Sequence, residues 1–241
     1  PGPNGTIFDI VFRSHGKLLI AGAFSTYNTT PRRRIALLNA DGTLDPSFQN
    51  NPSINGFAAT DIEILGDGKL LVGFSGNTTL SSLLRFNPDG LLDNSVYYNV
   101  SHKVGRVRRT AQQPDGKILI VGHFPYVNGV ERHSMARLNA DGSLDNSFVP
   151  FFNNFMGTQD LTSVVVQSDG KIIVGGFNGI VLRRLEADGS QDPSFITALQ
   201  IQTAIYDVAV LPNGQILAVG DLFDGTPGTK RILRFNANGT V

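Results

Sequence analysis

The residues with the clearest spacing for chemistry are the carboxylate and amide side chains of a turn that recurs along the chain. Asn39, Asp41 and Asp45 have the pattern N-x-D-G-x-x-D. The spacing returns in three further sets, which are Asn87, Asp89 and Asp93; Asn139, Asp141 and Asp145; and, with glutamate first, Glu186, Asp188 and Asp192. Clustered side-chain oxygens of this kind bind calcium in known loops, where a complete site has about six to eight oxygen ligands.

Three side chains per turn fall short of such a set, and asparagine and aspartate have another use in tight turns. Their side chains accept hydrogen bonds from nearby backbone amides, and both residues tolerate the left-handed conformation. We therefore expect structural turns and no metal site, with calcium binding as the alternative.

An arginine also recurs, at one position of a later apolar segment. It is present as Arg85, Arg137, Arg184 and Arg234, whereas Leu37 takes its place in the first copy. Arginines in equivalent positions could face an anionic ligand in a channel. We favour ion pairs with the recurring aspartates of the same or the next copy, because a bidentate pair would tie neighbouring units together.

The remaining candidates are aromatic and amide residues that do not recur. The segment FVPFFNNF is too apolar for an ordinary solvated loop, and flat rings beside amides suit a sugar or a peptide partner. The predicted ligand-binding residues are Tyr97, Tyr98, Asn99, Tyr126, Phe151, Phe152, Asn153 and Phe155. The alternative is that the phenylalanines fill the central channel or pack between structural units.

Other chemistry is not indicated by the sequence. The four histidines have no metal-binding spacing, and there is no nucleophile elbow or phosphate-binding loop. Lysine plus arginine and aspartate plus glutamate both number 20, which argues against nucleic acid as the main partner. No apolar stretch reaches the length of a membrane span. We expect a non-enzyme without a cofactor.

The elements that must position these residues belong to a repeat of about 50 residues. A DGK-type turn at Gly16, Gly68, Gly116, Gly170 and Gly214 joins two apolar segments, and a second turn follows at Gly42, Gly90, Gly142, Gly189 and Gly239. Asp-Gly and Asn-Gly between apolar runs predict hairpins. Glycines near the end of the second segment, at Gly22, Gly122, Gly176 and Gly220, would allow close approach of a neighbouring strand.

The arrangement predicts an all-β protein, a β-propeller built from five repeats of three to four antiparallel strands each. The expected units cover residues 5–52, 53–101, 102–153, 154–199 and 200–241 of a single propeller domain. LDPSF or LDNSF would form a short fourth strand. Either the N-terminal PGPNGT segment helps to close the last unit, or the repeat continues past Val241.

Three stretches carry a resemblance to a known family. RIALLNADGTLDPSF (34–48), QPDGKILIVGHF (113–124) and RLNADGSLDNSF (137–148) resemble the bacterial delta-60 repeat family. The resemblance covers all five units, although Val96 replaces the final phenylalanine of the second and Gln191 a leucine of the fourth. It implies a β-propeller in large secreted or surface proteins of bacteria, and it implies no activity.

Function is therefore expected where the units differ. In a propeller of antiparallel units the two recurring turns share one face, and the long variable loops share the other. We expect a non-catalytic binding or adhesion module of a bacterial secreted or surface protein, which recognises a glycan or a protein with those loops. One alternative is a structural stalk or fibre domain that contacts a neighbouring domain or subunit. A hydrolase-type propeller is the other.

Overall fold

The computed structural model describes residues 2–49, 54, 58–75, 82–100, 105–150, 160–177, 182–197, 199, 203–226 and 228–241. Within these residues the chain forms five units of three antiparallel strands, here called blades 1 to 5, and blades 2 and 3 are joined by one pairing between Ser75 and Arg106. Blade 1 contains β1 (Ile7–Phe12), β2 (Leu18–Gly22) and β5 (Ile35–Leu38); blade 2 contains β6 (Ala58–Ile64), β7 (Leu70–Ser75) and β8 (Leu83–Phe86). Blade 3 contains β9 (Arg106–Gln112), β10 (Ile118–His123) and β13 (Met135–Leu138). Blade 4 contains β14 (Asp160–Val166), β15 (Ile172–Phe177) and β16 (Leu182–Leu185); blade 5 contains β17 (Ala204–Val210), β18 (Ile216–Leu222) and β19 (Lys230–Phe235).

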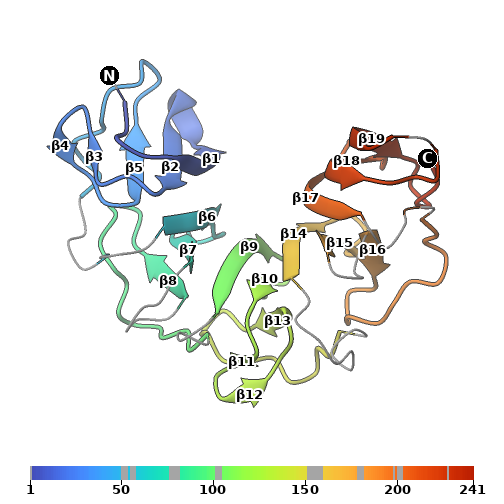
Figure 1. The fold of residues 1–241 in the computed structure, drawn as a ribbon. Coiled ribbons are helices and arrows are strands. Elements are labelled where there is room, and N and C mark those ends of the chain that lie inside the picture. The colour runs from blue at the N-terminus through green and yellow to red at the C-terminus, as the bar shows by residue number, and fades with distance from the viewer. Residues whose placement is uncertain are drawn as a thin grey trace.

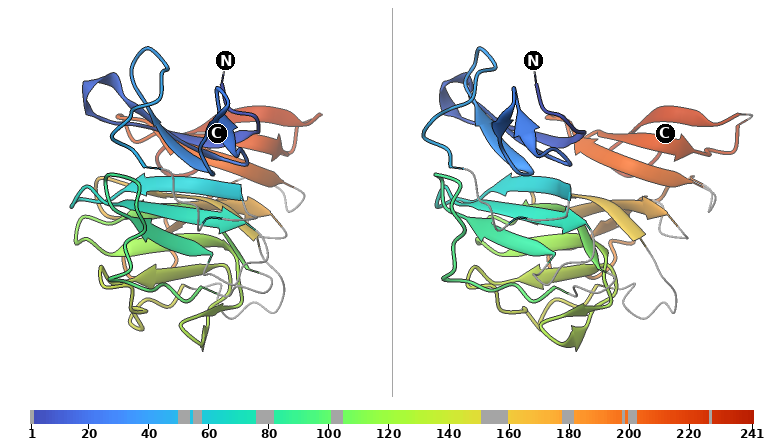
Figure 2. Two further views of the ribbon diagram at one scale, coloured as in Figure 1. Left: turned by 90° about the vertical axis from the view of Figure 1, so that its left-hand side faces the viewer. Right: turned by 60° about the vertical axis from the view of Figure 1, so that its left-hand side comes forward.

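The blades follow one another around an arc, with the first strand of each blade innermost (Figure 1). Blades 1 and 5 border the opening of this arc, and both chain termini lie there. Figure 2 shows the same stack of strands from two further sides. The expected β-propeller architecture is confirmed, and no helix in the described part of the chain is long and apolar enough to cross a membrane.

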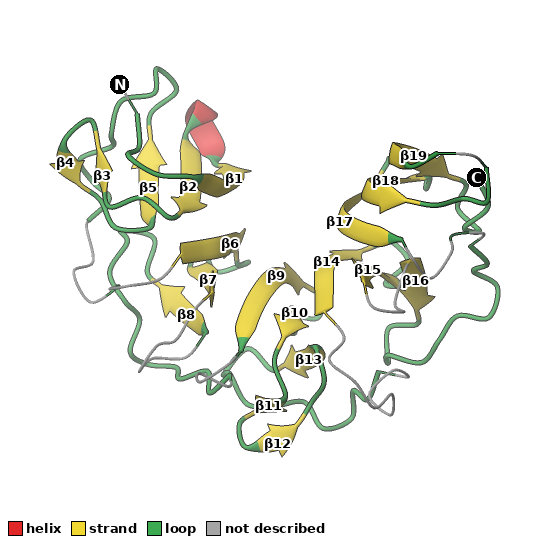
Figure 3. Ribbon diagram, viewed as in Figure 1, coloured by secondary structure: helices red, strands yellow, loops and turns green. Residues whose placement is uncertain are grey.

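Strand and turn make up almost all of the described regular structure (Figure 3). The described exception is a 3₁₀ turn at Ser14–Gly16. Two small hairpins lie outside the blades, β3 (Thr26–Tyr27) with β4 (Thr30–Pro31) and β11 (Tyr126–Val127) with β12 (Val130–Glu131). The Gly-containing turns join successive strands as expected. In a representative turn Gly68 has a φ of 81° and its N–H donates to the carbonyl of Leu65 at 2.8 Å, a conformation that favours glycine.

Three to four strands per unit were expected, with LDPSF as the possible fourth, and the described blades have three. The described contact is a single bridge in each of four blades, Leu38 to Leu44, Phe86 to Leu92, Leu138 to Leu144 and Leu185 to Gln191. The aspartate that follows turns the chain away, because its side chain accepts hydrogen bonds from the backbone and hydroxyl of Ser47, Ser95, Ser147 or Ser194 two residues later.

Two alternatives were expected for the last blade: the N-terminal segment closes it, or the repeat continues past Val241. The structure corrects the first expectation. The N–H of Asn4 donates to Thr26 at 3.1 Å, and the N–H of Asn28 donates to Gly2 at 2.9 Å. The segment therefore packs on the outer hairpin of blade 1.

The core consists of apolar clusters that each join two successive blades. Between blades 3 and 4, for example, Leu119, Val121 and Met135 pack against Leu161 and Val164. Burial of one such side chain is worth about 1.5–3 kcal/mol. The arc is therefore held together mainly by contacts between blades, and these contacts fix the innermost strands around a shared centre.

Candidate functional site

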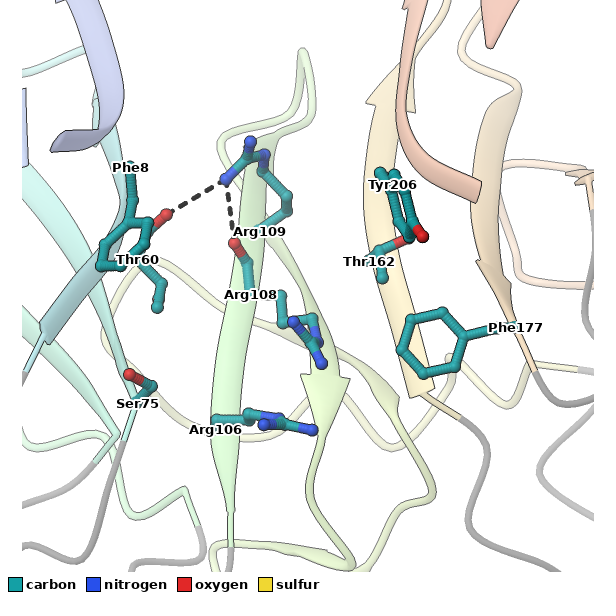
Figure 4. Close-up of a pocket in the computed structure, with 9 residues that line it drawn as sticks. All are labelled: Phe8, Thr60, Ser75, Arg106, Arg108, Arg109, Thr162, Phe177 and Tyr206. Atoms are coloured by element: carbon teal, nitrogen blue, oxygen red, sulfur yellow. Dashed lines mark hydrogen bonds between the residues drawn. The ribbon is translucent and has the colours of Figure 1, made fainter. Parts of the chain in front are cut away.

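A β-bulge in the first strand of each blade creates the most distinctive site. In all five blades the register against the second strand shifts at the same place, and the bulged residues are Phe8, Thr60, Arg108, Thr162 and Tyr206. A bulge re-aims one side chain. Here all five side chains line a central cavity of about 520 Å³, together with Ser75, Arg106, Arg109 and Phe177 (Figure 4).

The glycines of the second strand explain how the bulge fits. A Cβ on Gly22, Gly122, Gly176 or Gly220 would collide with a carbonyl oxygen of the facing first strand, as Gly122 would with Arg106. The predicted close approach of a neighbouring strand is confirmed at all four positions. In blade 2 the equivalent residue is Phe74 and the bulge is present as well, so the glycine permits the close approach but is not required for the bulge.

Arg106 and Arg108 form one side of the cavity and share a carboxylate. Nε and Nη2 of Arg108 donate to the two oxygens of Asp160 at 2.7 and 2.8 Å, and Nη2 of Arg106 donates to the same carboxylate at 2.8 Å. Burial alone would raise the pKa of Asp160, but the two guanidinium groups outweigh it and hold that pKa below its usual value. The guanidinium of Arg108 also lies 5.6 Å from the ring centre of Phe177.

Arg109 points toward the opposite side of the cavity (Figure 4). Its Nη1 donates to the backbone oxygen of Thr60 at 3.1 Å, and its guanidinium lies 3.7 Å from carboxylate oxygens of Asp61 and Asp207. One arginine of blade 3 thus contacts blades 2 and 5.

Arg109 directly follows the bulged residue of its blade. At this position Asp9, Asp61 and Ser163 of other blades accept a hydrogen bond from the next blade, which arginine cannot do. The side chain of Asp9 accepts from the N–H of Ile62, Asp61 from the N–H of Thr110, and Ser163 from the N–H of Val208. Burial, with the nearby charge of Asp9, raises the pKa of Asp61 to about 7. Asp61 therefore carries only part of a negative charge at neutral pH.

The cavity brings three guanidinium groups together with at least as many carboxylates, since Asp9 also lies near Asp61. Three guanidinium groups are balanced by Asp160, by Asp207 and by a partly protonated Asp61. The described lining residues add three aromatic rings and four hydroxyl groups, one of them on Tyr206, and include no carboxylate or histidine. Such a set can bind an anion beside a flat or hydroxylated group.

The loop residues predicted to bind a ligand lie elsewhere. Tyr97, Asn99 and Tyr126 are exposed, and the backbone N–H of Asn128 donates to Asn99 at 2.7 Å. Asn99 and Tyr126 are brought together at hairpin β11–β12, which lies at the outer edge of blade 3 (Figure 1), whereas Tyr97 lies beside Leu84 and Leu92 of blade 2. Phe151, Phe152, Asn153 and Phe155 lie outside the described residues.

Tyr98 requires a correction, because its side chain is buried instead of exposed. It packs in the apolar cluster between blades 2 and 3 and lies against Gly142 of the second turn. The sequence could not show this, since the socket belongs to a turn more than 40 residues away.

The recurring carboxylates act within the turns. Asp41 accepts from the N–H and hydroxyl of Thr43, and Asp45 accepts from Ser47 and from the ammonium of Lys17. The hydrogen bond from Lys17, followed by those from Ser47, lowers the pKa of Asp45 to about 2. Among the described residues no three acidic or histidine side chains gather to hold a metal. These contacts favour the structural interpretation of the turns.

The recurring arginines tie blades together, but not by the predicted bidentate pairs. Nε of Arg137 donates to Asp145 of its own blade at 2.8 Å, and Nη1 donates to the carbonyl of Ala187 in the next blade at 2.6 Å. Arg85 and Arg184 repeat both contacts, with Ala140 and Ala237 as the carbonyl partners. In blade 1, which has Leu37, Arg13 instead donates to the equivalent carbonyl of Pro88.

The cavity arginines Arg106, Arg108 and Arg109 were not predicted from the sequence, although a signal was present. The first strand of the third unit reads RVRRTAQ, whereas the fourth reads DLTSVVV and the fifth AIYDVAV. Three arginines in a strand that is otherwise apolar or hydroxylated mark a position where the repeat departs from its scaffold.

Comparison with protein families gives one match along the chain. The family described as "Domain of unknown function (DUF5122) beta-propeller" matches residues 14–48, 65–95, 113–148, 167–195 and 211–241, which is more than half of the chain. The comparison with curated proteins found no match.

Several solved structures have a similar fold. A protein of unknown function from Bacteroides caccae is 17% identical with a TM-score of 0.57, over 99% of this chain and 80% of that one. The calcium-binding protein regucalcin from Agrobacterium tumefaciens is 15% identical with a TM-score of 0.58, over 90% of this chain and 68% of that one. PorZ, a bacterial surface component of the type-IX secretion system of Porphyromonas gingivalis, is 16% identical with a TM-score of 0.54, over 88% and 30%. At these identities the similarity concerns the fold alone.

Proposed function

Because the chain belongs to the DUF5122 beta-propeller family, whose description gives a fold and no activity, we propose that it is a non-catalytic binding module for an acidic glycan. The glycan binds in the central cavity through its carboxylate. We place the module in a secreted or cell-surface protein of a bacterium, where such glycans are accessible partners.

One observation carries this proposal. The bulge directs one side chain of every blade into the same cavity, and the residues found there are arginine, aromatic and hydroxyl types. Arg106 makes one hydrogen bond to Asp160, which keeps both contacts from Arg108. Its guanidinium is therefore the group that can turn to a ligand carboxylate with the smallest structural cost. Phe8 and Tyr206 offer exposed rings for the flat face of a sugar. The hydroxyls of Thr60 and Thr162 already donate to the backbone oxygens of Val107 and Ile205 and therefore shape the cavity wall.

A binding screen tests the proposal. The probes are oligosaccharides that end in glucuronate or galacturonate, each paired with a neutral counterpart that ends in glucose or galactose. We expect the acidic probes to bind at least tenfold more tightly, because a charge-assisted hydrogen bond is worth about 1.5–3 kcal/mol. Phe8→Ala should weaken this binding without unfolding the protein, since Phe8 is exposed. Equal binding of acidic and neutral probes would reject the role of the ligand carboxylate, and binding of none would reject the glycan function and favour a structural domain without a ligand.

A further inference from the structure

Each interface between successive blades repeats three contacts. Apolar residues of the second and third strands of one blade pack on the next blade. An arginine donates to a carbonyl in the second turn of that next blade, at Pro88, Ala140, Ala187 or Ala237. An apolar side chain of the outgoing segment packs against the glycine of the same turn, as Phe48 does at Gly90, Val96 at Gly142, Phe148 at Gly189 and Phe195 at Gly239.

Blade 5 presents one half of this interface to solvent. This half, here called the donor half, consists of the apolar residues of the second and third strands and the arginine. Ile232 is 59% exposed, whereas the residues in equivalent register, Ile35, Leu83, Met135 and Leu182, are 0–3% exposed. Its strand neighbour Val219 is exposed as well. Arg234 occupies the position of the recurring arginines and is exposed, with no hydrogen bond or ion pair to any described residue.

Blade 1 presents the acceptor half. Ile10 is 52% exposed, whereas the equivalent residues Ile62, Thr110, Val164 and Val208 are 1–6% exposed. No atom lies within 4 Å of the Cβ position of Gly42, the glycine that corresponds to Gly90, Gly142, Gly189 and Gly239. Phe12, at the end of the same first strand, is largely exposed. The socket that receives an aromatic side chain at other interfaces is open here.

The two halves border the same opening of the arc (Figure 1). We propose that together they form a docking site for one further three-stranded blade of the same repeat type. Its first strand packs on Val219 and Ile232, and a carbonyl of its second turn accepts from Arg234. On its other side an arginine donates to the carbonyl of Ala40, and an aromatic residue of its outgoing segment fills the socket at Gly42.

The chemistry of the occupant follows from the established interfaces. A blade is the element that can satisfy both halves at once, because its two faces are the two faces that the interior blades already use. Blades 3 and 4 both supply an arginine and a phenylalanine for the acceptor half, and the pair of blade 4 is Arg184 and Phe195. The site is independent of the acidic-glycan function, because Ile232, Arg234 and Gly42 are not among the cavity residues.

The experiment compares the chain of residues 1–241 with the same chain extended after Val241 by a copy of residues 154–199. We expect a higher melting temperature and at least tenfold slower amide exchange in β1 and β19 of the extended chain. Ile232→Asp and Ile10→Asp should remove both gains and leave the five-blade chain nearly unchanged, because both residues are exposed there. Val149→Asp, a matched change of an exposed apolar residue in the outgoing segment of blade 3, should leave the gains intact.

Two results would overturn the proposal. One is an extended chain whose β1 and β19 amides exchange as fast as in the five-blade chain. The other is self-association of the five-blade chain that Ile232→Asp abolishes, which would make a second copy of the chain the occupant of these faces.

Discussion

The second turns and the inner cavity are both built from the same repeat. The side chains of the turns are the same from blade to blade, whereas those that line the cavity differ. On the turn side the same aspartate is found as Asp45, Asp93, Asp145 and Asp192, with the same serine contact two residues later. In the cavity one geometric position, the bulge, is occupied by Phe8, Thr60, Arg108, Thr162 and Tyr206. Backbone geometry recurs at both places, but it fixes the side chain only in the turns.

This difference separates scaffold from site. A turn aspartate contacts backbone amides that every blade has, so every blade needs it. A bulge requires only that the facing residue leaves room for a carbonyl, and it leaves the bulged side chain free to vary. The four predictions below test the separation in order of expected effect.

Removal of a recurring arginine should have the largest effect on stability. Arg137→Leu leaves buried Asp145 with Lys117 as its remaining basic partner and removes the donor to Ala187. We expect a loss of about 3 kcal/mol in the free energy of unfolding, measured by urea denaturation. Arg234→Leu is the matched control, since the exposed side chain of Arg234 makes no hydrogen bond or ion pair with a described residue, and should cost almost nothing. Equal losses in the two variants would contradict the proposed role of Arg137 in joining blades 3 and 4.

A glycine that faces the bulge should be the next most sensitive position. In Gly122→Ala the new methyl group collides with the carbonyl of Arg106, and overpacking of this kind costs about 1–3 kcal/mol. Thermal unfolding of the variant should show a clearly lower midpoint. Gly66→Ala serves as the control, because its Cβ would make an ordinary 3.6 Å contact. A neutral Gly122→Ala would show that the bulge does not depend on this close approach.

A third effect concerns Asp61 and the pH dependence of stability. Its folded pKa of about 7 lies above the unfolded value of about 3.9, so the folded state holds a proton that the unfolded state releases between these values. Its contribution to stability is full below about pH 4 and is lost as the pH rises toward 7. Asp61→Asn should flatten this part of the stability profile. If the free energy of unfolding of Asp61→Asn fell with pH between 4 and 7 as steeply as that of the natural chain, the titrating group would be a residue other than Asp61.

Arg106→Gln should have the smallest effect on stability, because Asp160 keeps both of its bonds from Arg108. We expect a change within about 0.5 kcal/mol, measured by the same urea titration. A large loss would mean that Arg106 belongs to the scaffold, as Arg137 does, and would weaken the distinction between cavity and turn.

The fold was predictable from the sequence because its main signals are local. Gly68 and Gly42 sit in turns that Asp and Asn specify within a few residues, and Gly122 was recognised as a close approach. The possible fourth strand is not found in the described blades because the LDPSF segment satisfies its backbone with the Asp45 side chain. The site was not predictable, because Tyr98 is buried by a distant turn and because the direction of Arg108 depends on a bulge register that the sequence does not display.

The most direct test of the central claim is a calorimetric titration of the protein with a glucuronate-terminated oligosaccharide. Three proteins are compared, the natural chain, Arg106→Gln in the cavity, and Tyr126→Ala at the outer edge of blade 3. The cavity site predicts at least tenfold weaker binding for Arg106→Gln and unchanged binding for Tyr126→Ala. Full affinity in Arg106→Gln, with loss in Tyr126→Ala, would contradict the account and move recognition to the outer loops.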